Sequence, residues 1–230
     1  HNFTKYITVA NEKSNKLADK KYHFQLEYFL SKAYLKIRDE ENAIRIAHTQ
    51  LNSNLTFNQR VSTYLLLAEG YLQKSNRDSA KYFLHKISPD TSRLKNKQLL
   101  SNYFLLCARS KIGGDSDGTS DFLKKSMQLM NENNPNIGSL YSYIANDLSN
   151  SRQIDSALNV LSKGLGLYQR NFKYDTIGLV NLKLLKGYLH FLSYDYTKSQ
   201  QLYESEIRPL IFGLHDWNPN GYNYLRCEFY

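Results

Sequence analysis

The sequence predicts an all-α protein built from consecutive antiparallel helix hairpins. Two observations in the stretch 61–89 carry this prediction. Apolar residues recur there at the i, i+3, i+4 and i+7 spacing of an amphipathic helix, once before and once after the polar break 75–78: Tyr64, Leu67, Ala68, Tyr71, then Ala80, Phe83, Leu84, Ile87. Small Ala68 and Ala80 fall where two antiparallel helices touch, because only small side chains let the backbones approach. Pro89 closes the unit because it removes an amide donor and clashes with the preceding helical turn.

The same arrangement returns along the chain. The small residue of the second helix recurs at intervals of 37, 40, 37 and 42, as Ala43, Ala80, Ser120, Ala157 and Ser199. We therefore expect about five hairpins, approximately over 22–52, 58–89, 95–131, 137–170 and 176–212. Because each hairpin of such an array buries its face against its neighbours, residues 1–230 are expected to form one elongated domain.

The remaining elements follow from the pattern between these units. A helix is expected over 3–18, packing on the helix 24–37, whose partner is 40–51. The later helices are expected over 95–111, 120–130, 137–150, 151–167, 176–193 and 197–209, with Asp175 or Thr176 as a cap. The loop 113–118 contains two aspartates but no downstream bidentate glutamate, which favours a flexible turn over a calcium site. Residues 213–230 form a C-terminal cap or the start of a further helix, with Trp217 covering the end of the stack.

The hairpin resembles the tetratricopeptide repeat, a unit of ~34 residues. The residues that carry the resemblance are Tyr64, Leu67, Ala68, Tyr71, Ala80 and Leu84, and again Tyr141, Ile144, Ala145, Leu148, Ala157 and Leu161. The longer intervals mark the copies as degenerate. The resemblance covers roughly 22–209 and implies a right-handed helical solenoid in which the first helix of each hairpin lines an inner groove.

That resemblance also selects candidate binding residues at the groove positions of the first helices: Tyr28, Lys32, Lys36, Glu69, Gln73, Asn102, Arg109 and Asn146. Lys32 stands where the carboxylate-clamp members of the family have an asparagine, so their specificity is not carried over. Amides, cations and tyrosines suit the backbone of an extended peptide. Lys32 and Arg109, against Glu69 alone, further predict a preference for acidic partners or partners with a C-terminal carboxylate. The alternative is that this face binds only water or a neighbouring domain.

Composition and charge leave a second class open. The chain has 30 basic and 21 acidic residues, a net charge of +9 and a pI of ≈ 9.3, which could mark a nucleic-acid surface. The basic residues are dispersed, so a lysine-rich solvated surface is favoured and no nucleic acid is expected as a partner. No run approaches the ~20 apolar residues that a membrane span requires.

No set of residues has the spacing that catalysis or metal binding requires. The six histidines are never paired at i, i+3 or i+4, and phosphate loops, nucleophile elbows and dinucleotide motifs are absent. Cys107 lies at an apolar first-helix position and Cys227 in the tail, and whether they pair is left open. We expect no enzymatic activity, cofactor or metal.

The function expected is a scaffold or sensor that binds a protein or an extended peptide, with a homodimer also possible. Degenerate arrays rich in Tyr, Lys and Asn are similar to the extracytoplasmic, periplasmic sensor regions of bacterial membrane-anchored regulators of transcription or signalling. A cytoplasmic peptide-responsive regulator and a helical-repeat nucleic-acid-binding protein are the alternatives. The chain starts at His1, and the apolar residues Tyr224, Leu225 and Phe229 stop in mid-pattern, so we expect the natural protein to continue.

Overall fold

The computed structural model describes residues 20–111 and 119–213, together with residues 9 and 12. Three expectations therefore lie outside the described residues. They are most of the helix over 3–18, the loop 113–118, and the C-terminal cap with Trp217. The pairing of Cys107 with Cys227 also lies outside them, because Cys227 is not described.

Every regular element of the described residues is a helix, and successive helices pack as adjacent pairs, which confirms the all-α class. The pairs are α2 (Lys20–Lys36) with α3 (Glu40–Leu51), α4 (Phe57–Gln73) with α5 (Arg77–Ile87), α6 (Lys97–Lys111) with α7 (Thr119–Leu129), α8 (Ile137–Asn150) with α9 (Ile154–Asn171), and α10 (Thr176–Leu192) with α11 (Tyr196–Leu202). A 3-10 helix, η1 (Ser88–Arg93), follows α5. A π-helical turn, η2 (Tyr203–Ile207), joins α11 to α12 (Arg208–Phe212). None of the described helices has the length and apolar character needed to cross a membrane.

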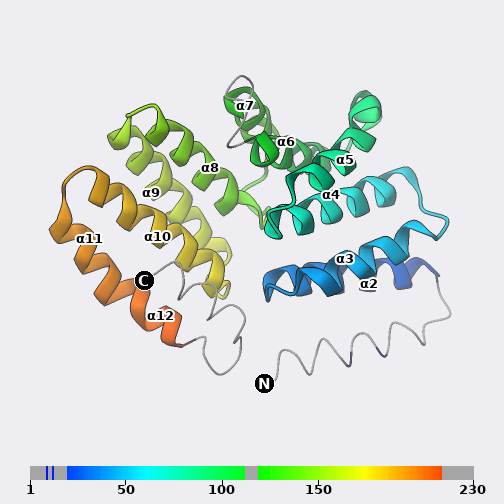
Figure 1. Cartoon of the computed structure of the whole chain (residues 1–230), viewed down its shortest axis with the longest axis horizontal. Helices are drawn as coiled ribbons and strands as arrows, with labels where there is room; N and C mark the ends of the chain where they lie inside the picture. Colours follow the sequence, from blue (N-terminus) through cyan, green and yellow to red (C-terminus); the bar gives the residue numbers. More distant parts are fainter. Residues whose placement is uncertain (1–8, 10–11, 13–19, 112–118, 214–230) are drawn as a thin grey trace.

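Neighbouring pairs pack on one another in chain order (Figure 1). The first helices α2, α4 and α6 contact one another in turn, as do α8 and α10, and α7 packs on α8 between these groups. Figure 1 shows that the pairs follow an arc, which brings the end of α2 close to the start of α10. Elements from opposite ends of the described chain therefore face the same central hollow.

The four described turns between paired helices share one backbone conformation. Arg38, Ser75, Arg152 and Tyr194 all have φ between 59° and 62°. In each turn the next residue donates its amide proton to the carbonyl oxygen five residues earlier, as from Asp39 to Tyr34 at 2.9 Å. A single left-handed residue followed by this hydrogen bond is a common way to end a helix. Each left-handed residue lies five positions before a predicted small residue, so the repeat in the sequence corresponds to a repeat in the backbone.

The paired helices touch at most of the predicted small residues. Ala80 and Ala157 have no exposed surface. The hydroxyl of Ser199 donates to the carbonyl oxygen of Gly187 at 2.9 Å, which requires the two helices to lie in direct contact. The third pair differs, because Ser120 is only half-buried. There, buried Ser101 and Ser126 each donate to the other's carbonyl oxygen at 3.0 Å, so the contact lies further along α7.

The apolar core runs along the arc between the helices. Two large clusters of buried residues both include residues of α6, and Phe122 of α7 packs against both. Leu67, Leu105 and Leu140, from three successive first helices, are fully buried. Since each pair buries its apolar face against the next, the polar face of the first helices is left for the inner side of the arc.

Candidate functional site

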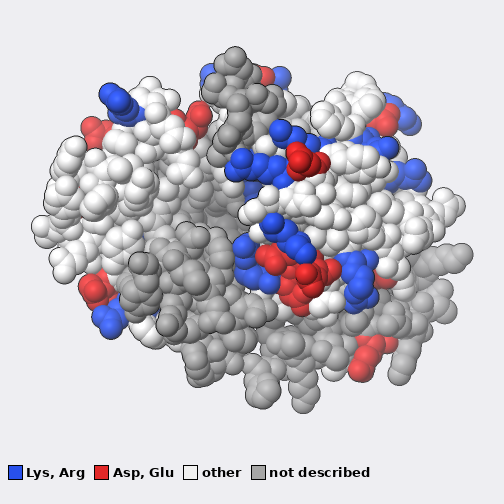
Figure 2. Space-filling view, viewed as in Figure 1, with Lys and Arg blue, Asp and Glu red and all other residues white. Residues whose placement is uncertain are grey.

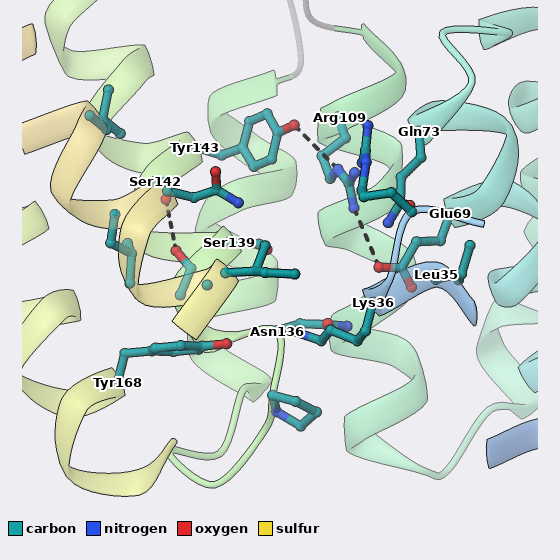
Figure 3. A pocket seen from close by; sticks show the side chains of 18 of the residues that line it. Leu35, Lys36, Glu69, Gln73, Arg109, Asn136, Ser139, Ser142, Tyr143 and Tyr168 are labelled. Carbon is teal, nitrogen blue, oxygen red and sulfur yellow. Dashed lines mark hydrogen bonds and ion pairs between the residues drawn. The ribbon is translucent and has the colours of Figure 1, made fainter. Parts of the chain in front are cut away.

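A cavity of ≈ 390 Å³ lies on the inner side of the arc (Figure 3). Helices α2, α4, α6, α8 and α10, the first helices of the five pairs, supply most of its lining. Among the described lining residues, four are cations, and Glu69 alone is acidic; the cations are Lys32, Lys36, Arg38 and Arg109. The lining is therefore polar and mainly cationic, although the carboxylates of Asp175 and Glu40 offset the charges of Lys36 and Arg38.

Arg109 of α6 joins three helix pairs at one wall of this cavity. Its Nε donates to the hydroxyl of Tyr143 on α8 at 3.3 Å, and its guanidinium lies 5.6 Å from the centre of that ring. Its Nη1 lies 3.9 Å from Oε1 of Glu69 on α4, and the two side chains are only 15% and 18% exposed. Figure 3 shows Arg109 between Tyr143 and Glu69. The low exposure weakens solvent screening, so this cation can act strongly on an anion that enters the cavity.

Gln73 of α4 contributes a polar atom whose hydrogen bonding is incomplete. Its side-chain oxygen is buried and, among the described residues, has no hydrogen-bond partner. A buried acceptor without a donor costs ~1 to 3 kcal/mol. Because Gln73 lines the cavity one helical turn after Glu69, a ligand N–H or O–H in the cavity could remove that cost.

A polar cluster links the end of α2 to the start of α10 at another edge of the cavity. The ammonium of Lys36 forms an ion pair and a hydrogen bond with the Asp175 carboxylate. Asp175 also caps α10 by accepting the amide proton of Gly178 at 3.1 Å, as predicted for the start of this helix, and accepts the Tyr168 hydroxyl proton at 2.5 Å. Lys36, Tyr168 and Gly178 all line the cavity.

The charges in this cluster are set by its hydrogen bonds. Burial alone would raise the pKa of Asp175, but the ammonium of Lys36 and the hydrogen bonds from Lys36, Tyr168 and Gly178 together lower it below its ordinary value. Burial, followed by the adjacent Asp175 carboxylate, raises the pKa of the Tyr168 hydroxyl. Asp175 is therefore an anion at neutral pH, and Tyr168 keeps the proton that it donates.

Two glycines make room for Tyr168. A Cβ atom on Gly138 of α8 would lie 2.8 Å from the tyrosine ring, and one on Gly178 of α10 would lie 2.4 Å from its hydroxyl. Both distances are shorter than carbon atoms tolerate without rearrangement. The Tyr168 ring, carried by α9, is therefore seated between its two neighbouring first helices, and this fixes the hydroxyl beside Asp175.

Six of the eight predicted binding residues line the cavity: Lys32, Lys36, Glu69, Gln73, Arg109 and Asn146. Among the described residues Lys32 makes no ion pair, and its ammonium lies 5.7 Å from the centre of the Tyr28 ring. Tyr28 itself lies outside the cavity lining and packs against the rings of Phe24 and Phe29.

Asn102 is the other predicted residue that lies outside the cavity lining, and its side chain forms hydrogen bonds within the protein. Its Oδ1 accepts hydrogen bonds from the Nδ2 atoms of Asn134 and Asn136, at 3.0 Å and 3.1 Å. Asn134 donates further to Oε1 of Gln98 at 2.6 Å. The amides therefore fix the linker between α7 and α8 against α6, and Asn136 is the member that reaches the cavity.

Sequence reasoning missed five contributors to the site. Arg38, Asn136, Tyr143 and Tyr168 were not among the predicted residues, and Asp175 was predicted only as a helix cap. Tyr168 belongs to the second helix of its pair, whereas the candidate binding residues were taken only from first helices. The glycines at 138 and 178 were a usable signal, because glycine within a helix often marks a close approach of a neighbouring side chain.

The described residues contain no group of three or more His, Cys, Asp or Glu side chains that could hold a metal ion. Comparison with known proteins gives no matching family model, no matching curated protein and no matching solved structure. The geometry of the cavity is therefore the basis for the functional proposal.

Proposed function

We propose that the chain is a non-enzymatic binding module that holds an extended, acidic segment of a protein or peptide in its inner cavity. One observation carries the proposal. The five first helices converge on one cavity, whose lining includes four cations, one carboxylate and the buried, unpartnered oxygen of Gln73. Two further carboxylates, Asp175 and Glu40, pair with Lys36 and Arg38. Such a site offers charge to anionic side chains and an acceptor to a backbone N–H.

The repeating geometry supports a degenerate tetratricopeptide-type solenoid as the scaffold. The left-handed turn residue recurs at Arg38, Ser75, Arg152 and Tyr194, and four of the five predicted small residues are buried at helix contacts. Arrays of stacked helix pairs commonly bind partners on the concave surface that stacking creates. An inner binding surface is therefore the arrangement that this scaffold favours.

A second hollow supports an extended ligand over a compact one. It has a volume of ≈ 600 Å³, borders the turn 75–78, and shares Arg109 and Tyr143 with the main cavity. A chain that fills the main cavity can therefore continue past Arg109. Backbone hydrogen bonds of ~0.5 to 1.5 kcal/mol each would spread the binding energy over several contacts.

The distribution of charge favours a protein partner over a nucleic acid. A nucleic-acid surface needs a contiguous stripe of Lys and Arg to follow the phosphate backbone. Figure 2 shows blue and red side chains next to one another around the central hollow, on the face that it presents. Ion pairs such as Arg38 with Glu40 at 3.2 Å and Lys74 with Glu41 at 3.1 Å place a carboxylate beside a cation and so interrupt the positive charge.

We further propose that this module serves as the sensor or scaffold of a larger bacterial regulator, either extracytoplasmic or cytoplasmic. The support is the resemblance of its degenerate, Tyr-, Lys- and Asn-rich repeats to such regions. The full reading frame would test this placement, because a membrane span or a DNA-binding domain elsewhere in it would identify the class of regulator.

The cavity proposal is tested by measuring the affinity of fluorescein-labelled hexaglutamate by fluorescence anisotropy. We expect Lys32→Met with Arg109→Gln to weaken binding about tenfold or more, because each hydrogen bond to a charged group contributes ~1.5 to 3 kcal/mol. The control is Lys163→Met with Arg45→Gln, which removes one exposed lysine and one exposed arginine from second helices. Thermal melts of both variants report whether each still folds.

The same assay separates the alternatives. Hexaglutamate with a free and with an amidated C-terminus distinguishes binding of a terminal carboxylate from binding of acidic side chains. Equal loss in the two double variants, or stronger binding of a single-stranded oligonucleotide than of hexaglutamate, would contradict the proposal.

A further inference from the structure

We propose that Asp175 is an internal competitor for the partner's carboxylate, and that its ion pair with Lys36 holds the arc closed until an acidic partner displaces it. The role of the partner rests on the proposed function. The closing contact itself is a property of the chain without a ligand, so the two can be tested separately.

The Lys36–Asp175 pair spans the arc. Lys36 ends α2 in the first helix pair and Asp175 precedes α10 in the fifth, 139 positions later. The ion pairs Lys74–Glu41 and Arg109–Glu69, in contrast, join neighbouring pairs. Figure 1 shows the end of α2 and the start of α10 approaching each other across the hollow. Breaking this contact therefore removes a link between the two ends of the array.

The contact also forms part of the binding cavity. Lys36 lines the cavity together with Tyr168 and Gly178, the two other groups that hold Asp175. A carboxylate that enters at this edge meets an ammonium already paired with a carboxylate of the protein. Because the ligand carboxylate and the Asp175 carboxylate would both pair with the Lys36 ammonium, binding of one opposes binding of the other.

Asp175 is held in place by more contacts than Lys36. Asp175 is 21% exposed and accepts two further hydrogen bonds, from Tyr168 and Gly178, whereas the Lys36 side chain is 51% exposed. Ion pairs of exposed lysines are weak and are screened by salt. Lys36 is thus the member that can be released, while Asp175 stays in place as the cap of α10.

Asp175→Asn tests the contact because asparagine removes the charge but keeps the oxygen that caps α10 through Gly178. Its side-chain NH2 takes the place of the second carboxylate oxygen, where it can donate to the Tyr168 hydroxyl oxygen. Asp195→Asn is the matched control. Asp195 caps α11 in the same way, through the amide of Lys198 at 3.2 Å, but its ion pair is with Lys198 of the same helix. Distances between spin labels at exposed positions 49 of α3 and 200 of α11, with Cys227 changed to serine, report the opening of the arc.

We expect Asp175→Asn to shift these distances to longer values and to broaden them, and Asp195→Asn to match the wild type. Raising the salt from about 0.05 M to about 0.5 M should open the wild type but leave Asp175→Asn unchanged. If the spin-label distances in Asp175→Asn at low salt equal those of the wild type, the ion pair does not hold the arc closed.

For binding, we expect Asp175→Asn to hold hexaglutamate about fivefold or more tightly than the wild type, because closure and binding are coupled. If Asp175→Asn and the wild type bind hexaglutamate equally although the spin-label distances differ, Asp175 does not compete with the ligand, but the ion pair still holds the arc closed. If neither protein binds hexaglutamate although the distances change, the proposed function fails and the closing contact survives.

Discussion

Gly164→Ala is expected to destabilise the protein by ~1 to 3 kcal/mol, whereas Gly166→Ala, two residues along the same helix, is expected to stabilise it by up to ~1 kcal/mol. A Cβ atom on Gly164 would lie 2.4 Å from both Cβ and Cγ of Tyr141 on α8. These atoms lie next to the α8 backbone, so the ring cannot rotate out of the way. The helices α8 and α9 would have to separate.

Gly166 is the matched control because a Cβ atom there would meet nothing within 4 Å and the residue is exposed. Alanine at this position gains helix propensity without a steric cost. In a chain of this size 1 kcal/mol corresponds to about 2 to 4 °C in melting temperature. The two variants should therefore melt on opposite sides of the wild type. A Gly164→Ala protein that melts at or above the wild-type temperature would show that α8 and α9 do not approach this closely.

Asn134→Ala is expected to cost about 2 to 4 kcal/mol, because it removes three hydrogen bonds of ~0.5 to 1.5 kcal/mol each. Asn134 is only 5% exposed. Its Nδ2 donates to Gln98 and Asn102 at 2.6 Å and 3.0 Å, and its Oδ1 accepts the amide proton of Asn136 at 2.9 Å. Alanine would remove the donor that the half-buried Gln98 Oε1 uses, while Asn102 Oδ1 would keep its hydrogen bond from Asn136.

Asn133→Ala provides the comparison one residue earlier. Asn133 is exposed. It donates its backbone N–H to Oδ1 of Asn131 at 2.9 Å, and alanine would keep that hydrogen bond. We expect its urea unfolding midpoint to match the wild type, while that of Asn134→Ala falls. Equal midpoints for the two variants would show that the amide cluster does not stabilise the linker before α8.

The apolar spacing was sufficient to predict the helices and their packing as adjacent pairs, because burial of one face determines both. The cap at Asp175 was predictable for a similar local reason, since its side chain satisfies an amide three residues away. Six predicted binding residues share a cavity; their positions were taken from the groove positions that the tetratricopeptide resemblance implies. The helices, their pairing and the cap at Asp175 therefore depend on local sequence.

The features that were missed depend on how far the arc curves. Lys36 meets Asp175 because the pairs follow an arc that brings the end of α2 close to the start of α10, and the spacing of apolar residues does not give the curvature of that arc. The use of Asn102 within the linker, and the seat of Tyr168 between two glycines, also follow from contacts between pairs. Sequence periodicity gives the face on which a residue lies, but not the neighbour that it meets there.

The most direct test of the inner-cavity proposal is a crystal structure of the chain with the tightest-binding acidic peptide selected from a displayed library. We expect an extended peptide along α2, α4, α6, α8 and α10, with carboxylates at Lys32 and Arg109 and a backbone N–H within hydrogen-bonding distance of the Gln73 side-chain oxygen. A peptide bound instead to the second helices, on the outer side of the arc near Arg45 or His85, would contradict it.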